Sequence, residues 1–456
     1  DVNGDGFSDV IVGSRSWDGG FSNEGRADVF LGSAAGLAAA PAWTAEPADE
    51  LNARFGIAVA SAGDVNGDGF ADVIVGARTW GTAPADEGRT YVYHGSLAGL
   101  SATPDWFADP TDQASALFGR SVASAGDVNG DGFSDVIVGS TLWDGGFSNE
   151  GRADVFLGSS SGLAAAPAWT VEPTDEVSAQ FGFSVSTAGD VNRDGYSDVF
   201  VGALNWGTAP ADEGRTYVYH GSAAGLAAAP NWTADPTDEA SAGFGFSAAC
   251  AGDVNGDGFS DVVVGADLWG TAPADEGRVY LYLGSTAGLV VAASQTLDTT
   301  DQASAFFGAS VAAGDVNGDG FSDVVVGANR WDGSIADEGG AFAFYGYGDP
   351  PTIGNRFSLA QFESDGVSPL EIGTQAAGAD VVFEGRLYNH SPIGGRLRLQ
   401  VEMKAIGTAF NGAGTQTGNP FNPGQAGRAT ISGIAVGAKH WRARVVYPGA
   451  FGFSRW

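Results

Sequence analysis

The chain has 456 residues, of which 72 are glycine and 43% are hydrophobic, and its formal net charge is −34. So acidic a chain argues against nucleic acid as a partner, because phosphate groups would be repelled. No apolar run approaches the ~20 residues of a membrane-spanning helix. Abundant glycine together with many hydrophobic residues is typical of short strands joined by tight turns, which predicts an all-β protein.

The first nine residues read D-V-N-G-D-G-F-S-D, and they return almost unchanged five times along the chain. The later copies begin at Asp64, Asp127, Asp190, Asp253 and Asp315, so the spacing is 63 residues four times and then 62. A period this long and this regular indicates a repeat architecture.

Each copy places oxygen-bearing side chains two residues apart. In the first copy these are Asp1, Asn3 and Asp5, followed by a glycine where the backbone must turn and then by Asp9. Calcium takes roughly six to eight oxygen ligands, and the loop offers those four side chains and the backbone carbonyl of Phe7. Carboxylates this close would repel one another without a cation between them. The loop is not an EF-hand, because a β-branched run that predicts a strand follows it instead of a Glu and a helix.

A complete repeat, residues 118–180, divides into four strand-like segments. These are residues 118–123, 135–139, 152–158 and 168–171. The first two flank the acidic loop as the arms of a hairpin do. Four strands in every repeat, with no helical period, predict the blades of a β-propeller.

The run F-G-x-S-V-A-x-A-G-D-V-N-G-D-G-F-S-D-V-I-V-G at 118–139 closely resembles the FG-GAP repeat of integrin alpha-subunit propellers and of many bacterial surface proteins. The resemblance covers residues 1–347 and implies a seven-bladed propeller, with Ca²⁺ bound between the first two strands of a blade and up to six Ca²⁺ in this chain. Carried over position by position, the side-chain ligands are Asp1, Asn3, Asp5, Asp9, Asp64, Asn66, Asp68, Asp72, Asp127, Asn129, Asp131, Asp135, Asp190, Asn192, Asp194, Asp198, Asp253, Asn255, Asp257, Asp261, Asp315, Asn317, Asp319 and Asp323. The residues whose backbone carbonyl takes the place of that of Phe7 are Phe70, Phe133, Tyr196, Phe259 and Phe321.

The two ends of the repeat array depart from the family pattern. The first repeat lacks its Phe-Gly strand, and the sixth lacks its fourth strand. We expect either upstream sequence or a neighbouring molecule to supply the missing strands. Homo-oligomers or filaments built through the unfinished blades are therefore one hypothesis.

Recurring side chains outside the loops allow structural and ligand-binding interpretations. The tryptophans either pack blade against blade or stack on sugar rings, and they are Trp17, Trp80, Trp143, Trp206, Trp269 and Trp331 after the second strand and Trp43, Trp106, Trp169 and Trp232 in the fourth. A Glu-Gly-Arg unit, as at 24–26, forms an ion pair at a turn or clamps a ligand. His94 and His220 stand where other repeats have Leu or Tyr, which assigns them to packing or to the surface and not to catalysis.

The repeats stop near residues 347–351, where two prolines and a shift in composition suggest a domain boundary. We expect a propeller at 1–349 and a β-sandwich at 352–456. Residues 381–387 and 396–402 alternate as half-buried strands do, and 433–445 resembles the late strands of a fibronectin type III or immunoglobulin-like domain.

The sequence carries no nucleophile–base constellation, no phosphate-binding loop and no His/Cys metal cluster, so we expect no enzyme and no catalytic residues. The first hypothesis is a secreted or cell-surface, calcium-stabilised propeller that binds an unidentified protein or glycan ligand or serves adhesion. One alternative is a structural subunit of an extracellular filament or surface assembly. A second is an accessory part of a polysaccharide-degrading enzyme.

Overall fold

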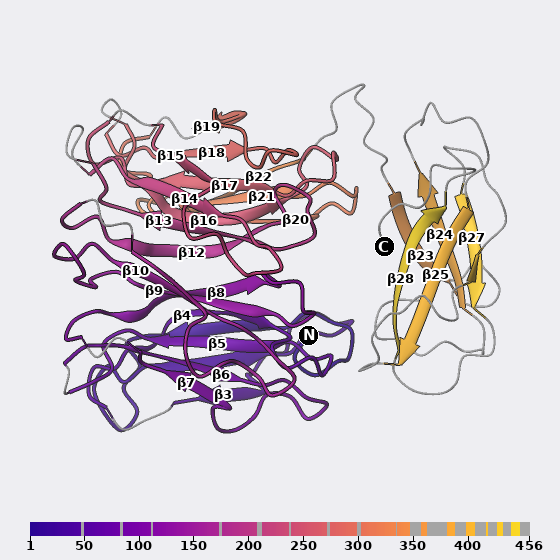
Figure 1. Cartoon of the computed structure of the whole chain (residues 1–456), viewed down its shortest axis with the longest axis horizontal. Coiled ribbons are helices and arrows are strands. Elements are labelled where there is room, and N and C mark those ends of the chain that lie inside the picture. The colour runs from indigo at the N-terminus through magenta and orange to yellow at the C-terminus, as the bar shows by residue number, and fades with distance from the viewer. Residues whose placement is uncertain are drawn as a thin grey trace. The chain divides into compact units, whose positions relative to one another are not determined.

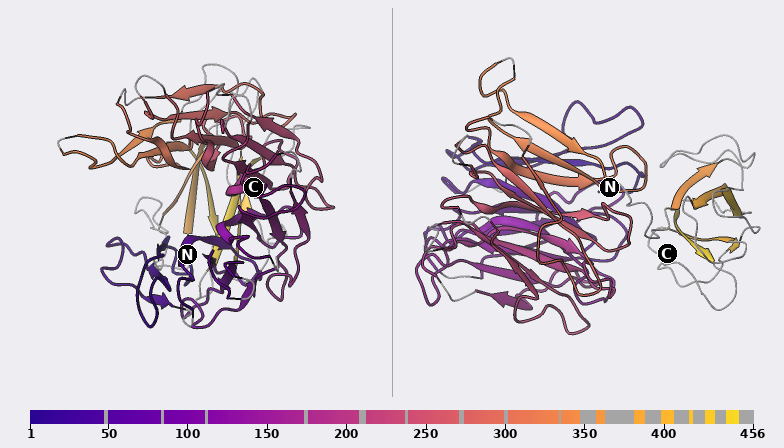
Figure 2. Two further views of the ribbon diagram at one scale, coloured as in Figure 1. Left: turned by 90° about the vertical axis from the view of Figure 1, so that its left-hand side faces the viewer. Right: turned by 90° about the horizontal axis from the view of Figure 1, so that it is seen from above.

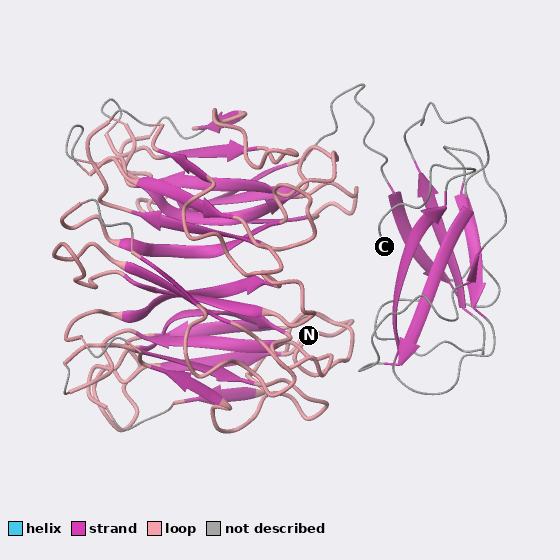
Figure 3. Cartoon of the chain, in the orientation of Figure 1, coloured by secondary structure: helices cyan, strands magenta, loops and turns pink. Residues whose placement is uncertain are grey.

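The computed structural model describes residues 1–46, 50–82, 85–110, 113–172, 176–207, 212–236, 239–270, 274–298, 302–333 and 335–346, and the backbone of six strands between 357 and 446. The chain separates into two compact units. The first contains Asp1–Val254, Phe259–Val316 and Ser322–Gly346, and the second contains Asn255–Gly258, Asn317–Phe321 and Tyr347–Trp456. The described residues form strands, turns and loops and no helix, which confirms the all-β prediction (Figure 3).

Six antiparallel sheets follow one another along the first unit, one for each repeat (Figure 1). The second to fifth sheets each have four strands, which lie in sequence order. The second sheet has β4 (Phe55–Gly63), β5 (Asp72–Ala77), β6 (Arg89–Tyr93) and β7 (Trp106–Ala108), and the third has β8 (Phe118–Gly126), β9 (Asp135–Ser140), β10 (Arg152–Phe156) and β11 (Trp169–Val171). The fourth has β12 (Phe181–Gly189), β13 (Asp198–Ala203), β14 (Arg215–Tyr219) and β15 (Trp232–Ala234), and the fifth has β16 (Phe244–Gly252), β17 (Asp261–Ala266), β18 (Arg278–Tyr282) and β19 (Gln295–Leu297). The first sheet has β1 (Val10–Ser14), β2 (Arg26–Phe30) and β3 (Trp43–Ala45), and the last has β20 (Phe307–Gly314), β21 (Asp323–Ala328) and β22 (Gly340–Phe344). The predicted four strands in a complete repeat, and the three in each end repeat, are confirmed.

The second strand of a blade is buried on both faces because each face meets a different neighbour. In β5, Val73 and Val75 join the core shared with the preceding sheet, whereas Ile74 joins the core shared with the following one. Residues 72–77 are all buried. This two-sided burial explains the continuous β-branched run, which a strand with one solvated face would not need.

The first strands of consecutive blades lie side by side along the inside of the array, in the order β4, β8, β12, β16 and β20, and β1 lies next to β4. The six sheets follow an arc, with the first sheet in indigo and the last in orange at its two ends (Figure 2). This arrangement is that of propeller blades. The seventh blade stays a prediction.

The second unit has two three-stranded antiparallel sheets among its described strands. They are β23 (Phe357–Phe362), β24 (Val381–Leu387) and β27 (Ala426–Ile431), and β26 (Gln416–Thr417), β25 (Arg398–Ala405) and β28 (Lys439–Val446). The predicted strand at 381–387 is confirmed, and the one predicted at 396–402 is confirmed with its start two residues and its end three residues later. The boundary predicted at 347–351 lies outside the described residues, and the fibronectin type III or immunoglobulin-like sandwich stays a prediction.

Candidate functional site

The first acidic loop leads directly into β1, and each later loop connects the first and second strands of its blade. The first four loops are organised around the carboxylate at their first position. In the third copy, Asp127 Oδ1 accepts hydrogen bonds from the amides of Gly130 at 2.7 Å and Asp131 at 3.1 Å, and Oδ2 accepts one from Gly132 at 2.8 Å. Asn129 Nδ2 donates to Asp131 Oδ2 at 2.9 Å. The first and second copies make the same bonds. The side chains at positions 1, 3 and 5 therefore lie in one short loop, as the spacing predicted.

The carboxylate at position 9 has a role that the sequence analysis did not foresee. Asp135 is fully buried, and its two oxygens accept the amides of Val128 at 2.9 Å and Gly158 at 2.8 Å. The same pair of bonds recurs at Asp9, Asp72, Asp198, Asp261 and Asp323. Burial raises the pKa of Asp135 to about 6, although the two amides oppose the shift. This residue clamps the loop to the end of the third strand.

Consecutive loops are also bonded to one another across the blade interface. The amide of Ser134 donates to Asp64 O at 2.9 Å, and the amide of Asp64 donates to Ser134 Oγ at 3.1 Å. The aromatic ring at position 7 packs on the glycine at position 4 of the preceding loop: a Cβ on Gly67, whose φ is +74°, would lie 2.6 Å from Phe133 Cε1. Neighbouring loops are therefore in direct contact along the array.

The donor set of a loop fits a hard cation, since three oxygen side chains and nearby carbonyls lie within one turn of chain. Within the described ranges, however, no three His, Cys, Asp or Glu side chains converge as a metal site. The predicted ligands at positions 1, 3 and 5 are brought together in each of the first four loops, and each loop forms its own cluster. The carbonyl at position 7 and the carboxylate at position 9 stay predictions as ligands.

The arginine of the Glu-Gly-Arg unit stacks on the tryptophan that follows the second strand of the same blade. Arg89 lies over the ring of Trp80, with its guanidinium carbon 3.3 Å from the ring centroid, and forms an ion pair with Asp109. Glu24 accepts the amides of Gly20 at 2.7 Å and Phe21 at 3.0 Å. The arginine of the unit therefore does form an ion pair, but with an Asp outside the unit, while the Glu of the first unit binds the backbone of the preceding turn. An arginine guanidinium lies over the ring of each of Trp17, Trp80, Trp143, Trp206 and Trp269.

The second set of tryptophans packs between blades. Trp106 Nε1 donates to Ala164 O of the next blade at 3.0 Å, and the ring meets Phe156 edge-on with centroids 4.9 Å apart. Trp43, Trp169 and Trp232 make the equivalent hydrogen bonds. The packing interpretation is confirmed for these residues.

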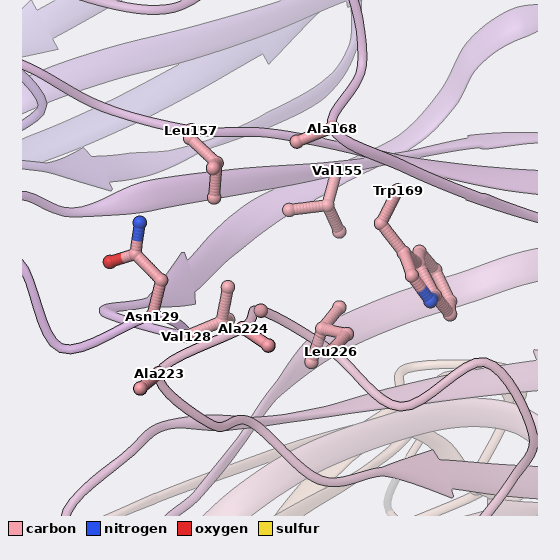
Figure 4. Close-up of a pocket in the computed structure, with 10 residues that line it drawn as sticks. Val128, Asn129, Val155, Leu157, Ala168, Trp169, Ala223, Ala224 and Leu226 are labelled. Carbon is pink, nitrogen blue, oxygen red and sulfur yellow. The ribbon is translucent and has the colours of Figure 1, made fainter.

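A cavity of about 210 Å³ lies between the third and fourth sheets, bordered by Leu157, Trp169, Leu226 and the loop residue Asn129 (Figure 4). Leu157 is the counterpart of His94 and His220. At the two histidine positions the imidazole lies against a glycine of the next blade. A Cβ built on Gly162 would lie 3.1 Å from His94 Cε1. The two histidines therefore pack between blades, which is one of the two predicted roles.

The FG-GAP repeat family matches five segments of the chain, at residues 55–93, 118–156, 181–219, 245–282 and 307–345. The chain contains FG-GAP repeats. Each match begins at or beside a Phe-Gly strand, and the first acidic loop, which has no such strand before it, lies outside the five matches. The predicted resemblance is confirmed over these segments.

Integrin alpha chains are similar to part of this chain. Integrin alpha-IIb of Mus musculus is 34% identical over 160 residues, covering 34% of this chain and 15% of the integrin. Integrin alpha-V of Gallus gallus is 31% identical over 221 residues, covering 45% and 19%, and integrin alpha-5 of Xenopus laevis is 32% identical over 193 residues, covering 40% and 18%. The chain thus spans less than a fifth of the length of these relatives.

Among solved structures, a beta-fructofuranosidase from Schwanniomyces occidentalis complexed with fructosyl-erythritol is matched over 82% of this chain and 81% of its own. The identity is 9% and the TM-score 0.31, a likeness too weak to support an activity. The described residues include no helix of the length and apolarity that a membrane crossing requires.

Proposed function

We propose that this chain is the calcium-stabilised propeller of a secreted or cell-surface protein, that it serves adhesion or ligand binding, and that it is not an enzyme. The observation that carries the proposal is the acidic loop. It recurs six times, and in the first three copies its oxygen side chains at positions 1, 3 and 5 are drawn into one turn by backbone amides. The similarity to integrin alpha chains, in the part that this sequence covers, supports the same class of function.

Calcium would act by binding the folded blades and not the unfolded chain. At ten times its dissociation constant, a ligand stabilises a fold by about 1.4 kcal/mol at each site. Extracellular modules bind calcium at about 10⁻⁴ to 10⁻³ M, which suits a secreted protein better than a cytosolic one. Because the loops are bonded across the blade interfaces, occupancy of one site should also stiffen its neighbours.

A non-catalytic role is supported by the position of the histidines whose side chains are described. His94 and His220 lie between blades, and burial lowers the pKa of His220. We further propose that residues 1–349 form the propeller and that residues 352–456 form a separate sandwich domain.

Calorimetric titration with calcium, together with thermal unfolding in calcium and in chelator, tests the proposal. We expect up to six bound ions and a large fall in the unfolding temperature after chelation. An unfolding temperature that does not change in chelator would contradict the calcium role. A screen of glycans and extracellular matrix proteins then identifies the ligand, and turnover of a polysaccharide would contradict the non-catalytic role.

Assembly between copies of the chain is a second candidate, and the end sheets favour it. Val10 and Val12 of β1 are 40% and 43% exposed, whereas their counterparts Val73 and Val75 are 3% and 0% exposed. Valines that pack against a neighbouring blade everywhere else thus lie open on the first sheet. Light scattering over a concentration series should reveal oligomers that Val12→Lys abolishes. A monomer at every concentration would rule this candidate out.

A further inference from the structure

Four arginines at one end of the blades form no ion pair with an acidic side chain in the described part of the chain. The arginines that stack on tryptophan are each paired with an aspartate, as Arg89 is with Asp109. In contrast, no ion pair is formed by Arg15, Arg54, Arg78 or Arg120 with the acidic side chains that the structure describes. In a chain with 55 acidic and 21 basic residues, four uncompensated arginines in three consecutive blades need an explanation.

These arginines lie at the strand ends opposite to the acidic loops. Arg15 follows the end of β1, and Arg78 follows the end of β5. Arg54 precedes the start of β4, whose other end leads into the loop at Asp64. Phe55 pairs with Ala77, so Arg54 and Arg78 are adjacent across two paired strands.

The four charges are close enough to repel one another. The pKa of Arg78 is lowered first by burial and then by the charges of Arg54 and Arg15. The pKa of Arg120 is lowered to about 10, again first by burial and then by Arg78 and Arg15. Arg78 Nε is buried and has no hydrogen-bond partner within the described part of the chain. Like charges held together in this way favour an anion among them.

Aromatic side chains fix the orientation of one member of the cluster. The guanidinium carbon of Arg120 lies 4.4 Å from the ring centroid of Phe183, and Phe183 meets Phe246 at 5.3 Å. The three residues occupy the same position on the neighbouring inner strands β8, β12 and β16. A guanidinium stacked by its face keeps its N–H groups directed outward in its plane, where they can bind an oxyanion.

The cluster is not a general feature of the repeat. The counterparts of Arg15 and Arg78 in the other blades are Thr141, Leu204, Asp267 and Asn329. The counterparts of Arg120 are Ile57, Phe183, Phe246 and Ala309. A residue needed to build the blade would recur in every copy, whereas these arginines are confined to the first three.

We propose that Arg15, Arg54, Arg78 and Arg120 form a binding site for an oxyanion, either a sulfate group or a carboxylate carried by an acidic ligand. Arginine forks bind such groups with paired, charge-assisted hydrogen bonds. The inference deepens the ligand-binding function proposed above and rests on it for its biological meaning. Because the calcium loops lie at the opposite strand ends, the two proposals can fail separately.

Calorimetric titration with sodium sulfate at constant ionic strength, on the calcium-loaded full chain, tests the site. We expect one saturable site whose affinity falls by about tenfold or more in Arg78→Gln and in Arg120→Gln, because each removes a charged hydrogen-bond donor. Arg330→Gln is the matched control, since Arg330 lies over Phe306 in the sixth blade. A sulfated disaccharide and an oligogalacturonate are then titrated in competition with sulfate for the site. The ligand that displaces sulfate at the lower concentration shows whether the natural group is a sulfate or a carboxylate.

Thermal unfolding separates this role from a structural one. Without sulfate, Arg120→Gln should unfold at the same or a higher temperature than the unmodified chain, because it relieves repulsion, and it should lose the rise that sulfate produces. A lower unfolding temperature in Arg120→Gln would indicate that the Arg120 side chain stabilises the fold, and it would overturn the proposal. So would the absence of saturable sulfate binding, or an equal loss of affinity in Arg330→Gln. Normal calcium binding in the variants would show that the loops are intact.

Discussion

Replacing Trp106 by alanine measures how strongly neighbouring blades hold each other. The side chain of this residue is 9% exposed, and its ring meets Phe156 of the next blade with centroids 4.9 Å apart. Its indole nitrogen donates a 3.0 Å hydrogen bond to Ala164 O, also in the next blade. Trp106→Ala therefore removes an apolar contact, an aromatic pair and a hydrogen bond from one interface.

The expected loss of stability follows from these contacts. A buried aromatic side chain covers about 150–250 Å², which at about 25 cal/mol per Å² is worth roughly 4–6 kcal/mol as an upper bound. The lost aromatic pair and the unpaired carbonyl each add about 1 kcal/mol, while relaxation around the cavity recovers part of the total. We therefore expect Trp106→Ala to reduce the free energy of unfolding by about 4 kcal/mol.

Urea unfolding followed by near-ultraviolet circular dichroism, in saturating calcium, is the assay. The matched control is Trp17→Ala, because that ring is 42% exposed and belongs to the first blade. The control should cost about 1 kcal/mol, in keeping with a partly exposed side chain. Equal losses in the two variants would refute the assignment of Trp106 to blade packing. Glycan binding lost in Trp106→Ala while the fold stays intact would instead revive the sugar-platform hypothesis.

Four further predictions concern calcium, loop geometry and charge. Chelation should lower the unfolding temperature and increase proteolysis, and equal digestion rates with and without calcium would contradict this. Asp131→Asn should weaken calcium binding at one site, measured by calorimetry, whereas Asp86→Asn, which makes the same charge change outside the loops, should leave every site unchanged. Gly67→Ala should destabilise the chain more than Gly99→Ala: both have positive φ, but a Cβ would clash with an aromatic ring only at Gly67, and equal midpoints in urea would disprove the contact. Burial raises the pKa of Asp267 to about 7, so this group contributes stability below its unfolded pKa near 4 that is lost as the pH rises through about 7. Asp267→Asn should therefore increase the free energy of unfolding at pH 8 by about 3 kcal/mol and have little effect at pH 4. A gain in stability that does not depend on pH would contradict the raised pKa of Asp267.

Much of the fold was predictable because the information for it is local. The β-branched run in residues 135–140 and the loop glycines that precede it specify a hairpin within about 25 residues of chain, and the structure has strands there. Because the same pattern occurs six times, the prediction of a hairpin is more secure than a single copy would allow. Positions 1, 3 and 5 of the acidic loop were predictable for the same reason, because they interact within a single turn.

Features that join one blade to another could not be predicted. Asp135 was predicted as a ligand, but its bond to Gly158 depends on a residue 23 positions away, at the end of the third strand. The hydrogen bond of Trp106 reaches a residue 58 positions away in the next blade. Sequence alone left packing and sugar binding open for this tryptophan, and only the pairing of blades decided between them.

The repeat, the strands and the chemistry of each loop follow from the sequence alone, because β-branched runs and turn residues act between neighbours in the chain. Which side chains of different blades meet depends on how the blades pack. Arg120 gives no sign in its own repeat that it will stack on Phe183, since the contact exists only when the inner strands β8 and β12 lie side by side. Whether like charges gather at one end of the blades is likewise set by the register of one blade against the next, and that register is fixed by packing over the whole interface and not by any local pattern.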